Sequence, residues 1–268
     1  MSAATLHRAA CAHGQIAWRE AGHGTPLLLL HGIGSGSGSW AGQFDALARD
    51  YRVLAWDAPG YGDSDPLAVA HPLGNDYAAA LTGLLAAAQV QEPVIVVGHS
   101  LGAIVAAAWA ARQPGRVSAL VLASPARGYR SAPADVRESK YRERVELVQR
   151  LGIARMAAER SAALCAPGAS AAALEAVRSN MARATPGGYA QAAWMLAHDD
   201  LLAHLKDAPR PRAVLCGELD RTTPPDACEE VARKCRAPFV LLRDVAHACY
   251  VEDPAQFNAA LLACLKPR

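Results

Sequence analysis

The sequence predicts an α/β fold in which helices flank a mostly parallel β-sheet. Short apolar runs recur towards both ends of the 268-residue chain, and each run is continuously apolar rather than alternating. This pattern is typical of strands buried on both faces of a parallel sheet. Helical segments separate most of these runs, and strands that alternate with helices indicate an α/β protein. A chain of this length can bury a large core without disulfides or a structural metal.

The first two expected strands form an antiparallel hairpin at the sheet edge, joined across His13 and Gly14. The six later runs end in turn residues such as Gly, Asp or Pro. In chain order the expected strands are 6–12, 15–20, 27–30, 52–56, 94–97, 117–122, 213–216 and 239–242, and the clearest helices are 78–88, 101–113 and 254–265.

One long segment interrupts this alternation. No strand-like run occurs between Arg127 and Lys206, where a helical pattern rich in Ala, Arg and Glu is broken at Pro-Gly pairs. So much helix between two strands predicts a lid over the carboxyl edge of the sheet, and we expect its charges to form a solvated helix face. The expected organisation is therefore a core of residues 1–124 and 209–268, with a helical cap of residues 125–208.

Composition argues against several classes of protein. Lys and Arg number 27 against 25 Asp and Glu, a net charge of +2, whereas a nucleic-acid-binding protein normally carries a basic excess on one face. No run approaches the ~20 apolar residues of a membrane span. The richest run, residues 78–88, is interrupted by Thr82 and Gly83. We therefore expect neither nucleic acid nor a membrane as a partner, and the sequence leaves the oligomeric state open.

The seven cysteines are scattered and none stands in a Cys-x-x-Cys pair, so the sequence has neither zinc-ribbon nor redox-motif spacing. The first residues lack the basic and apolar regions of a secretory signal. We expect a reduced, cytoplasmic protein without a metal site.

The strongest chemical signal is the sequence Gly-His-Ser-Leu-Gly at residues 98–102. It follows an apolar strand and begins a helix, which is the context of a nucleophile elbow. The sharp turn strains the serine backbone and exposes its hydroxyl beside the positive end of the helix. The flanking glycines are needed because side chains there would collide with the strand or the helix. Ser100 is therefore the predicted nucleophile.

A serine hydroxyl needs a general base, and the base needs an orienting carboxylate. In this architecture the partners follow in the order Ser, Asp or Glu, His. His247 is the only histidine after residue 204 and follows the last strand, so it is the predicted base. Asp220, on the loop after the strand 213–216, is the favoured carboxylate, with Glu218 and Asp244 as competitors.

The oxyanion formed during acyl transfer needs two aimed N–H donors. The backbone of Leu101 supplies one, and that of Ile33, in the loop after an earlier strand, is expected to supply the other. The Gly-Ser run at 34–39 lacks the Lys-Ser/Thr ending of a phosphate-binding loop, so we expect a loop at the pocket edge. Residues 223–226, Thr-Pro-Pro-Asp, are expected to be structural, with Thr223 as the N-cap of a helix.

These motifs together resemble the α/β-hydrolase superfamily: the His31-Gly32 pair, the loop 57–64, the elbow around Ser100, Asp220 and His247. The resemblance covers residues 1–124 and 209–268. It implies the α/β-hydrolase fold, a mostly parallel sheet of about eight strands with a helical cap inserted after the sixth strand, and a structural role for the loop 57–64. It implies no cofactor.

The cap is similar to that of 3-oxoadipate enol-lactonases, notably around residues 186–190 and 196–202, and the segment 247–254 fits the same group. One departure concerns the superfamily's carbon–carbon bond hydrolases, which have Trp after the catalytic histidine. Ala248 stands there in this sequence, which disfavours that chemistry.

The expected activity is hydrolysis of a small ester or lactone by Ser100, His247 and Asp220. The alternatives are carbon–carbon bond hydrolysis or cofactor-free haloperoxidase chemistry on the same residues, and a non-catalytic ligand receptor on the same fold. Arg127 and Arg130 are candidates for recognising a substrate carboxylate or are simply cap-surface residues. Tyr189 and Trp194 are expected either to line the pocket or to pack the cap helices.

Overall fold

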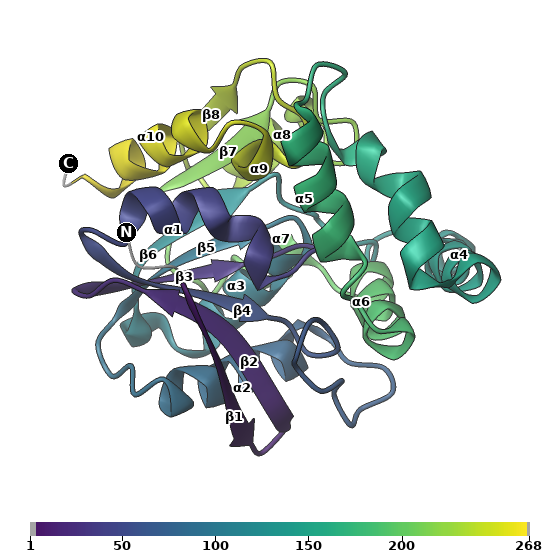
Figure 1. Ribbon diagram of the computed structural model, residues 1–268, viewed down its shortest axis with the longest axis horizontal. Coiled ribbons are helices and arrows are strands. Elements are labelled where there is room, and N and C mark those ends of the chain that lie inside the picture. The colour runs from purple at the N-terminus through teal and green to yellow at the C-terminus, as the bar shows by residue number, and fades with distance from the viewer. Residues whose placement is uncertain (1–3, 267–268) are drawn as a thin grey trace.

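The computed structural model describes residues 4–266, which fold around one eight-stranded sheet (Figure 1). The spatial order is β1-β2-β4-β3-β5-β6-β7-β8. The strands are β1 (Thr5–Cys11), β2 (Gly14–Ala21), β3 (Thr25–Leu30), β4 (Tyr51–Asp57), β5 (Val94–His99), β6 (Val117–Ala123), β7 (Ala213–Gly217) and β8 (Phe239–Leu242). This sheet confirms the predicted fold class.

Strand pairing follows the predicted pattern. β1 and β2 form an antiparallel edge hairpin, in which Cys11 pairs with Gly14. β2 also pairs antiparallel with β4, whereas every pair from β4 to β8 is parallel. The carboxyl ends of the parallel strands therefore meet at one edge of the sheet, where ligands bind in open α/β folds.

Helices cover both faces of the sheet. The α-helices of residues 4–266, including those at one end of the sheet, are α1 (Ala41–Leu47), α2 (Gly74–Ala87), α3 (Leu101–Arg112), α4 (Ala134–Arg160), α5 (Ala171–Met181), α6 (Pro186–His198), α7 (Leu201–His204), α8 (Pro225–Lys234), α9 (Cys249–Glu252) and α10 (Pro254–Leu265). Short 3₁₀ helices lie at Ser37–Trp40, Pro114–Arg116 and Ser161–Leu164. In Figure 1, α1 and α10 lie on one side of the sheet and α2 on the other.

The core consists of two layers, because successive side chains of a strand point to opposite faces. In β3, Leu28 and Leu30 pack with α2, α3 and α8, whereas Leu27 and Leu29 pack with α1 and α10. All four leucines are fully buried. The continuously apolar run that predicted this strand thus reflects burial on both faces.

Four helices, α4 to α7, follow β6 and precede β7. Figure 1 shows α4, α5 and α6 together at one end of the sheet. The helix α4 is interrupted at Gly152, whose φ of 69° and ψ of 162° divide it into two arms. The carboxylate of Asp199, after α6, accepts a hydrogen bond of 2.6 Å from the backbone N–H of Gly74. The inserted helices are therefore attached to the core at the start of α2.

The loop after β4 provides a second attachment. Asp57 is buried and accepts a 2.8 Å hydrogen bond from the N–H of Ser37, while Ser64 donates to the carbonyl oxygen of Asp57 at 2.6 Å. Within this fixed loop, Gly60 lies directly against Gly188 of α6. A Cβ at Gly188 would collide with the backbone of Gly60.

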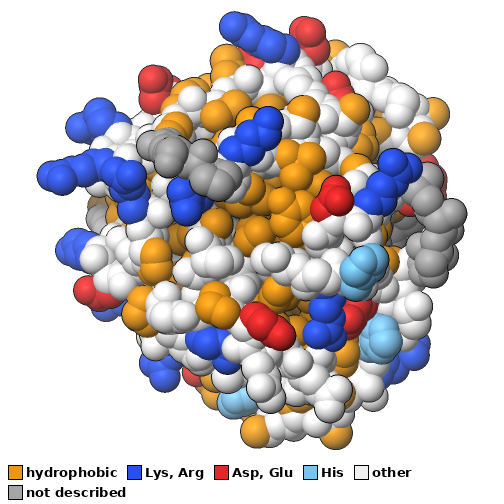
Figure 2. Space-filling model, turned by 90° about the vertical axis from the view of Figure 1, so that its left-hand side faces the viewer, with side chains coloured by type: hydrophobic (Ala, Val, Ile, Leu, Met, Phe, Trp, Pro, Cys, Tyr) orange, Lys and Arg blue, Asp and Glu red, His pale blue; other side chains and the backbone are white. Residues whose placement is uncertain are grey.

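The face away from the inserted helices carries side chains of both charge signs, with hydrophobic side chains near its centre (Figure 2). No helix within residues 4–266 is long and apolar enough to cross a membrane.

The contact between Gly60 and Gly188 makes a stability prediction. Gly188→Ala should lower the free energy of unfolding by about 1–3 kcal/mol, because overpacking against fixed backbone forces it to move. Urea unfolding followed by circular dichroism measures the change.

Gly187→Ala is the matched control, since a Cβ at Gly187 has no atom within 4 Å. It should be neutral or stabilising by up to about 1 kcal/mol through helix propensity. Equal stability of the two variants would contradict the close approach of Gly60 to Gly188.

Candidate active site

Ser100 occupies the turn between β5 and α3 with a φ of 51° and a ψ of −118°. A non-glycine residue rarely adopts a positive φ, so the backbone here is strained. A Cβ at Gly98 would lie 2.6 Å from the carbonyl oxygen of Gly102, and one at Gly102 would collide with that of Leu30. Both glycines flanking Ser100 are therefore required by close backbone approach, as the sequence predicts for a nucleophile elbow.

His247 and Asp220 meet at the same edge of the sheet. Asp220 lies after β7 and His247 between β8 and α9, and the His247 Nδ1 is 2.9 Å from the Asp220 Oδ2. Their exposed fractions are 5% and 3%. Because a carboxylate only accepts, the Nδ1 carries the proton and the Nε2 is the free acceptor.

Hydrogen bonds keep Asp220 ionised despite its burial. Burial by itself raises the pKa of this carboxyl, but hydrogen bonds from His247 and the backbone outweigh it and lower the pKa to about 2. The backbone N–H groups of Thr222 and Thr223 donate to the Oδ1 at 2.8 and 2.9 Å. The site therefore holds a negative charge behind the imidazole at neutral pH.

Neither competing carboxylate contacts His247 in the part of the chain that the structure describes. Glu218 forms an ion pair of 2.6 Å with Arg243 and accepts from the N–H of Asp244 at 3.3 Å. Of the three acids considered from the sequence, only Asp220 hydrogen-bonds to His247 among the described residues.

Thr223 belongs to this site, and the prediction that it caps a helix is wrong. Its hydroxyl lies 2.9 Å from the Asp220 Oδ2, 3.0 Å from the carbonyl oxygen of Ser124 and 3.3 Å from the His247 Nδ1. The N-cap of α8 is Pro224, which has no side-chain cap. The sequence motif looked like a helix start because Thr often occupies that position. The contact with Asp220 arises from the turn that precedes the helix.

His99, next to the serine, holds the histidine loop. Its Nε2 donates to the carbonyl oxygen of His247 at 2.8 Å, since a carbonyl oxygen can only accept. Burial, followed by the nearby His247, lowers the pKa of His99 to about 3. His99 is therefore neutral and links the serine turn to the loop that carries His247. Sequence reasoning missed this role, because the bond joins residues 148 positions apart.

A cavity of about 530 Å³ opens over these groups, and Ser100, His247, Thr223 and Ile33 line it. The loop that carries Ile33 passes directly over the serine, because a Cβ at Gly32 would lie 2.7 Å from the Cβ of Ser100 and 3.2 Å from its Oγ. Leu101 is the first residue of α3, so its N–H belongs to the group that has no partner within the helix.

The other predicted binding residues are spread over the inserted segment. Arg127 lines the cavity, but its Nη1 forms a 2.6 Å ion pair with Glu230. Arg130 is exposed and is not among the residues that line the cavity.

Tyr189 lines a neighbouring cavity beyond Ile33. Trp194 stacks between His71 and His198, with ring centroids 3.8 and 3.7 Å apart. The ring also meets that of Tyr141 in α4 edge to face, with centroids 5.2 Å apart, so Trp194 packs α6 against α4 and lines neither cavity among the described residues.

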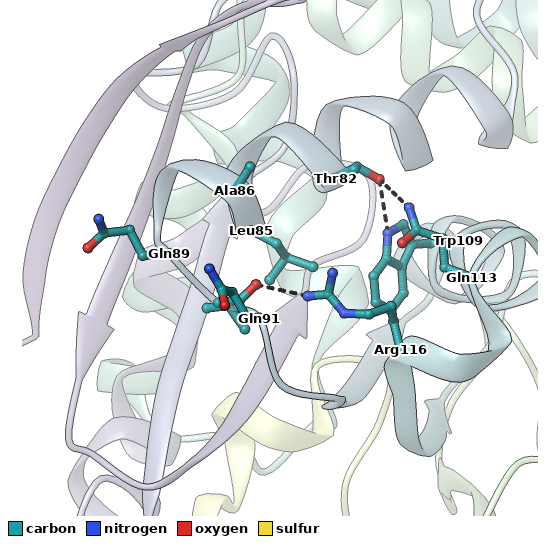
Figure 3. A pocket seen from close by; sticks show the side chains of 9 residues that line it. Thr82, Leu85, Ala86, Gln89, Gln91, Trp109, Gln113 and Arg116 are labelled. Carbon is teal, nitrogen blue, oxygen red and sulfur yellow. Dashed lines mark hydrogen bonds between the residues drawn. The ribbon is translucent and has the colours of Figure 1, made fainter.

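A further pocket of about 450 Å³ lies between the ends of α2 and α3 (Figure 3). Its polar side chains bond to one another and to nearby backbone: Trp109 and Gln113 donate to the Thr82 hydroxyl at 3.2 and 3.0 Å, and Arg116 donates to a carbonyl oxygen. It lies at the carboxyl end of α3, roughly 18 Å along that helix from Ser100. It contains none of the predicted site residues.

Within the part of the chain that the structure describes, no group of three or more His, Cys, Asp or Glu side chains is placed to hold a metal ion.

Comparison with solved structures finds the same fold in other proteins. An esterase from Thermogutta terrifontis, solved with malate bound, superposes with a TM-score of 0.85 and 26% identity over 98% of both chains. The enol-lactonase from Burkholderia xenovorans LB400 gives a TM-score of 0.83 and 21% identity over 97% of this chain and 99% of that one. The second likeness shows the fold alone.

Among curated proteins, rat 1-acylglycerol-3-phosphate O-acyltransferase ABHD5 is 38% identical over 108 residues, which cover 38% of this chain and 29% of that protein. The matched segment is thus less than a third of that relative. The model of the alpha/beta hydrolase fold family matches residues 25–254. With the eight-stranded sheet and the serine turn already described, this match shows that the chain belongs to the α/β-hydrolase family.

Proposed function

We propose that this protein is a serine hydrolase that cleaves a small carboxylic ester or lactone through an acyl-enzyme. The observation that supports the proposal is the convergence of Ser100 and His247 on one cavity, with Asp220 hydrogen-bonded to the far side of the imidazole. The three groups come from three separate strand ends. Membership of a hydrolase family and the likeness to the Thermogutta esterase support the same chemistry.

In the proposed reaction the Ser100 Oγ attacks the carbonyl carbon while the His247 Nε2 takes its proton. Asp220 fixes the imidazole tautomer and stabilises the imidazolium. The N–H groups of Ile33 and Leu101 bind the oxyanion. His247 then protonates the departing alcohol oxygen, and a water molecule, deprotonated by His247, releases the acid and restores Ser100.

The buried partners of the histidine are proposed to act by positioning. His99 fixes the backbone of His247, and Thr223 fixes the carboxylate of Asp220. Neither needs to touch the substrate. Ala248, which follows His247, is buried and donates its N–H to the carbonyl oxygen of Leu164 at 2.9 Å. The residue that distinguishes carbon–carbon bond hydrolases is thus absent where the cap segment meets the histidine loop.

Ser100→Ala should lower the kcat for p-nitrophenyl acetate by about 10⁶-fold, as removal of the nucleophile does in a comparable serine enzyme. The same variant should lose covalent labelling by a fluorophosphonate. Ser118→Ala, an exposed serine at the start of β6, should retain wild-type turnover and labelling. Ser100→Ala turnover within tenfold of wild type would overturn the proposal. Activity towards a vinylogous diketone or towards peroxide with halide, without ester hydrolysis, would favour the alternative chemistries.

Thr223→Val should lower kcat about 3- to 10-fold, because it removes one hydroxyl hydrogen bond to the Asp220 carboxylate while keeping the side-chain shape. Steady-state ester hydrolysis measures this. Thr25→Val, at an exposed strand start remote from the site, is the control. Unchanged kcat in Thr223→Val would show that the hydroxyl does not help to orient the carboxylate.

The lowered pKa of His99 should make the free energy of unfolding decrease as the pH falls. Its pKa is about 3 in the fold against an ordinary 6.5, so between these values the unfolded chain binds a proton that the folded chain does not. The contribution of neutral His99 to the free energy of unfolding is fully present above pH 6.5. It is lost as the pH falls towards 3, with a slope of up to about 1.4 kcal/mol per pH unit. Urea unfolding between pH 4 and 7 should show a flatter dependence in His99→Gln than in wild type. His13→Gln, in the exposed hairpin turn, should leave it unchanged, and parallel curves for wild type and His99→Gln would refute the assignment.

A further inference from the structure

A second cavity, of about 610 Å³, continues the first one beneath the inserted helices. The two share four lining residues, namely Ile33, Arg144, Leu164 and Thr222. The boundary between them therefore includes Ile33, whose N–H is the proposed oxyanion donor. A substrate bound at Ser100 has room to extend past this point into the second cavity.

The walls of the second cavity carry more positive than negative charge. Its basic residues are Lys140, Arg144, Arg150 and Arg160, and its acidic residues are Glu143 and Glu146. Lys140 and Glu143 neutralise each other at 3.6 Å, and Ser139 also donates to Glu143. Three arginines then face one remaining carboxylate. This wall is open to solvent, since Arg150 and Arg160 are exposed and Arg144 is half-buried.

All three arginines retain unused hydrogen-bond donors, and two of them, Arg144 and Arg160, carry charges that affect Tyr189 of α6. Among the described residues, Arg144 makes a single hydrogen bond, of 2.7 Å from its Nη1 to the carbonyl oxygen of Lys140, and no ion pair. Arg160 makes neither an ion pair nor a side-chain hydrogen bond within residues 4–266. A guanidinium has five N–H donors in a planar fork that fits a carboxylate or phosphate.

The charges of Arg144 and Arg160 both affect the pKa of Tyr189, a residue of α6. They come from different arms of α4, on either side of Gly152, and the positive charges of both oppose the rise that burial causes in the pKa of Tyr189. Tyr189 is 8% exposed and lines the second cavity, and its hydroxyl has no hydrogen-bond partner among the described residues. This hydroxyl is not among the fully buried unpartnered atoms of the described residues, so it is accessible from the cavity to a ligand or to water.

We propose that Arg144, Arg160 and Tyr189 bind an anionic group, a carboxylate or a phosphate, at the end of the substrate remote from the scissile ester. This inference rests on the proposed function. It names the substrate class: an ester or lactone whose acyl part carries a terminal anion. It also differs from the sequence expectation for Arg127 and Arg130, since Arg127 is paired with Glu230 and Arg130 does not line either cavity among the described residues.

The test compares p-nitrophenyl esters of equal acyl length that end in a carboxylate (mono-p-nitrophenyl glutarate), a phosphonate (the ester of 4-phosphonobutanoate) or a methyl group (p-nitrophenyl pentanoate). Ser100→Ala gives the background of spontaneous hydrolysis. Wild type should prefer an anionic ester in kcat/KM by at least about tenfold, the effect of a charge-assisted hydrogen bond. The better of the two anionic esters identifies the terminal group.

Arg144→Gln and Arg160→Gln should each reduce the anionic-to-neutral ratio about tenfold, mainly through KM, and Tyr189→Phe should reduce it less. Arg155→Gln is the matched control. Arg155 is on the same helix, is exposed, pairs with Glu159 at 2.7 Å and does not line the cavity. It should keep the wild-type ratio. Equal rates for the anionic and neutral esters in wild type, or an unchanged ratio in both arginine variants, would overturn the inference.

A binding experiment separates failure of this inference from failure of the proposed function. Glutarate is titrated into Ser100→Ala by calorimetry and into the same protein carrying Arg144→Gln. If no ester is cleaved but glutarate binds and the second substitution weakens binding about tenfold, the proposed function fails and the anion site stands. If esters are cleaved and glutarate does not bind, the anion site fails alone.

Discussion

The backbone turn at Ser100 is the constraint on which the rest of the site depends. It joins a strand to a helix within one residue, and it exists only because Gly98 and Gly102 let backbone atoms approach where a Cβ would collide. Gly32 allows the neighbouring loop equally close to the serine. The packed strands on both sides of β5 hold Ser100 in its strained backbone conformation. The same three close approaches set the hydroxyl and the two proposed oxyanion amides relative to one another.

A buried polar network extends this geometry to the histidine. His99 bonds to the backbone of His247, and Asp220 bonds to its ring from the opposite side. Each member is buried, and a buried polar group that loses its hydrogen-bond partner costs free energy. The network also reaches the inserted segment, because Glu252 accepts from the N–H groups of Ala246 and Ala166 at 3.0 and 2.6 Å. The position of the histidine is thus coupled to the segment that closes over the cavity.

The inserted helices border both cavities. The cavity over Ser100 is lined by strand ends together with residues of α4, α6 and α8, whereas the second cavity is lined mainly by α4. The interruption at Gly152 lets two arms of α4 contribute arginines to one wall. Under the proposed function, the core holds the reacting groups and the inserted helices contact the remote part of the substrate.

Local pattern alone predicted the strands, the edge hairpin and the serine turn, and the structure contains all three. Continuous hydrophobicity, glycine spacing and turn residues are properties of neighbouring positions, and each has a local steric or hydrophobic cause. Among Asp220, Glu218 and Asp244, sequence favoured Asp220 but left the competition open. The 2.9 Å hydrogen bond between His247 and Asp220 shows which carboxylate contacts the ring.

Only the tertiary structure decided the contacts of His99 and Thr223 with His247 and the placement of Arg144 and Arg160 on one cavity wall, because each depends on residues that are far apart in the chain. Whether a helical arginine faces solvent or a cavity depends on how its helix is rotated and what lies opposite. That orientation is set by packing between elements and not by the sequence of the helix itself.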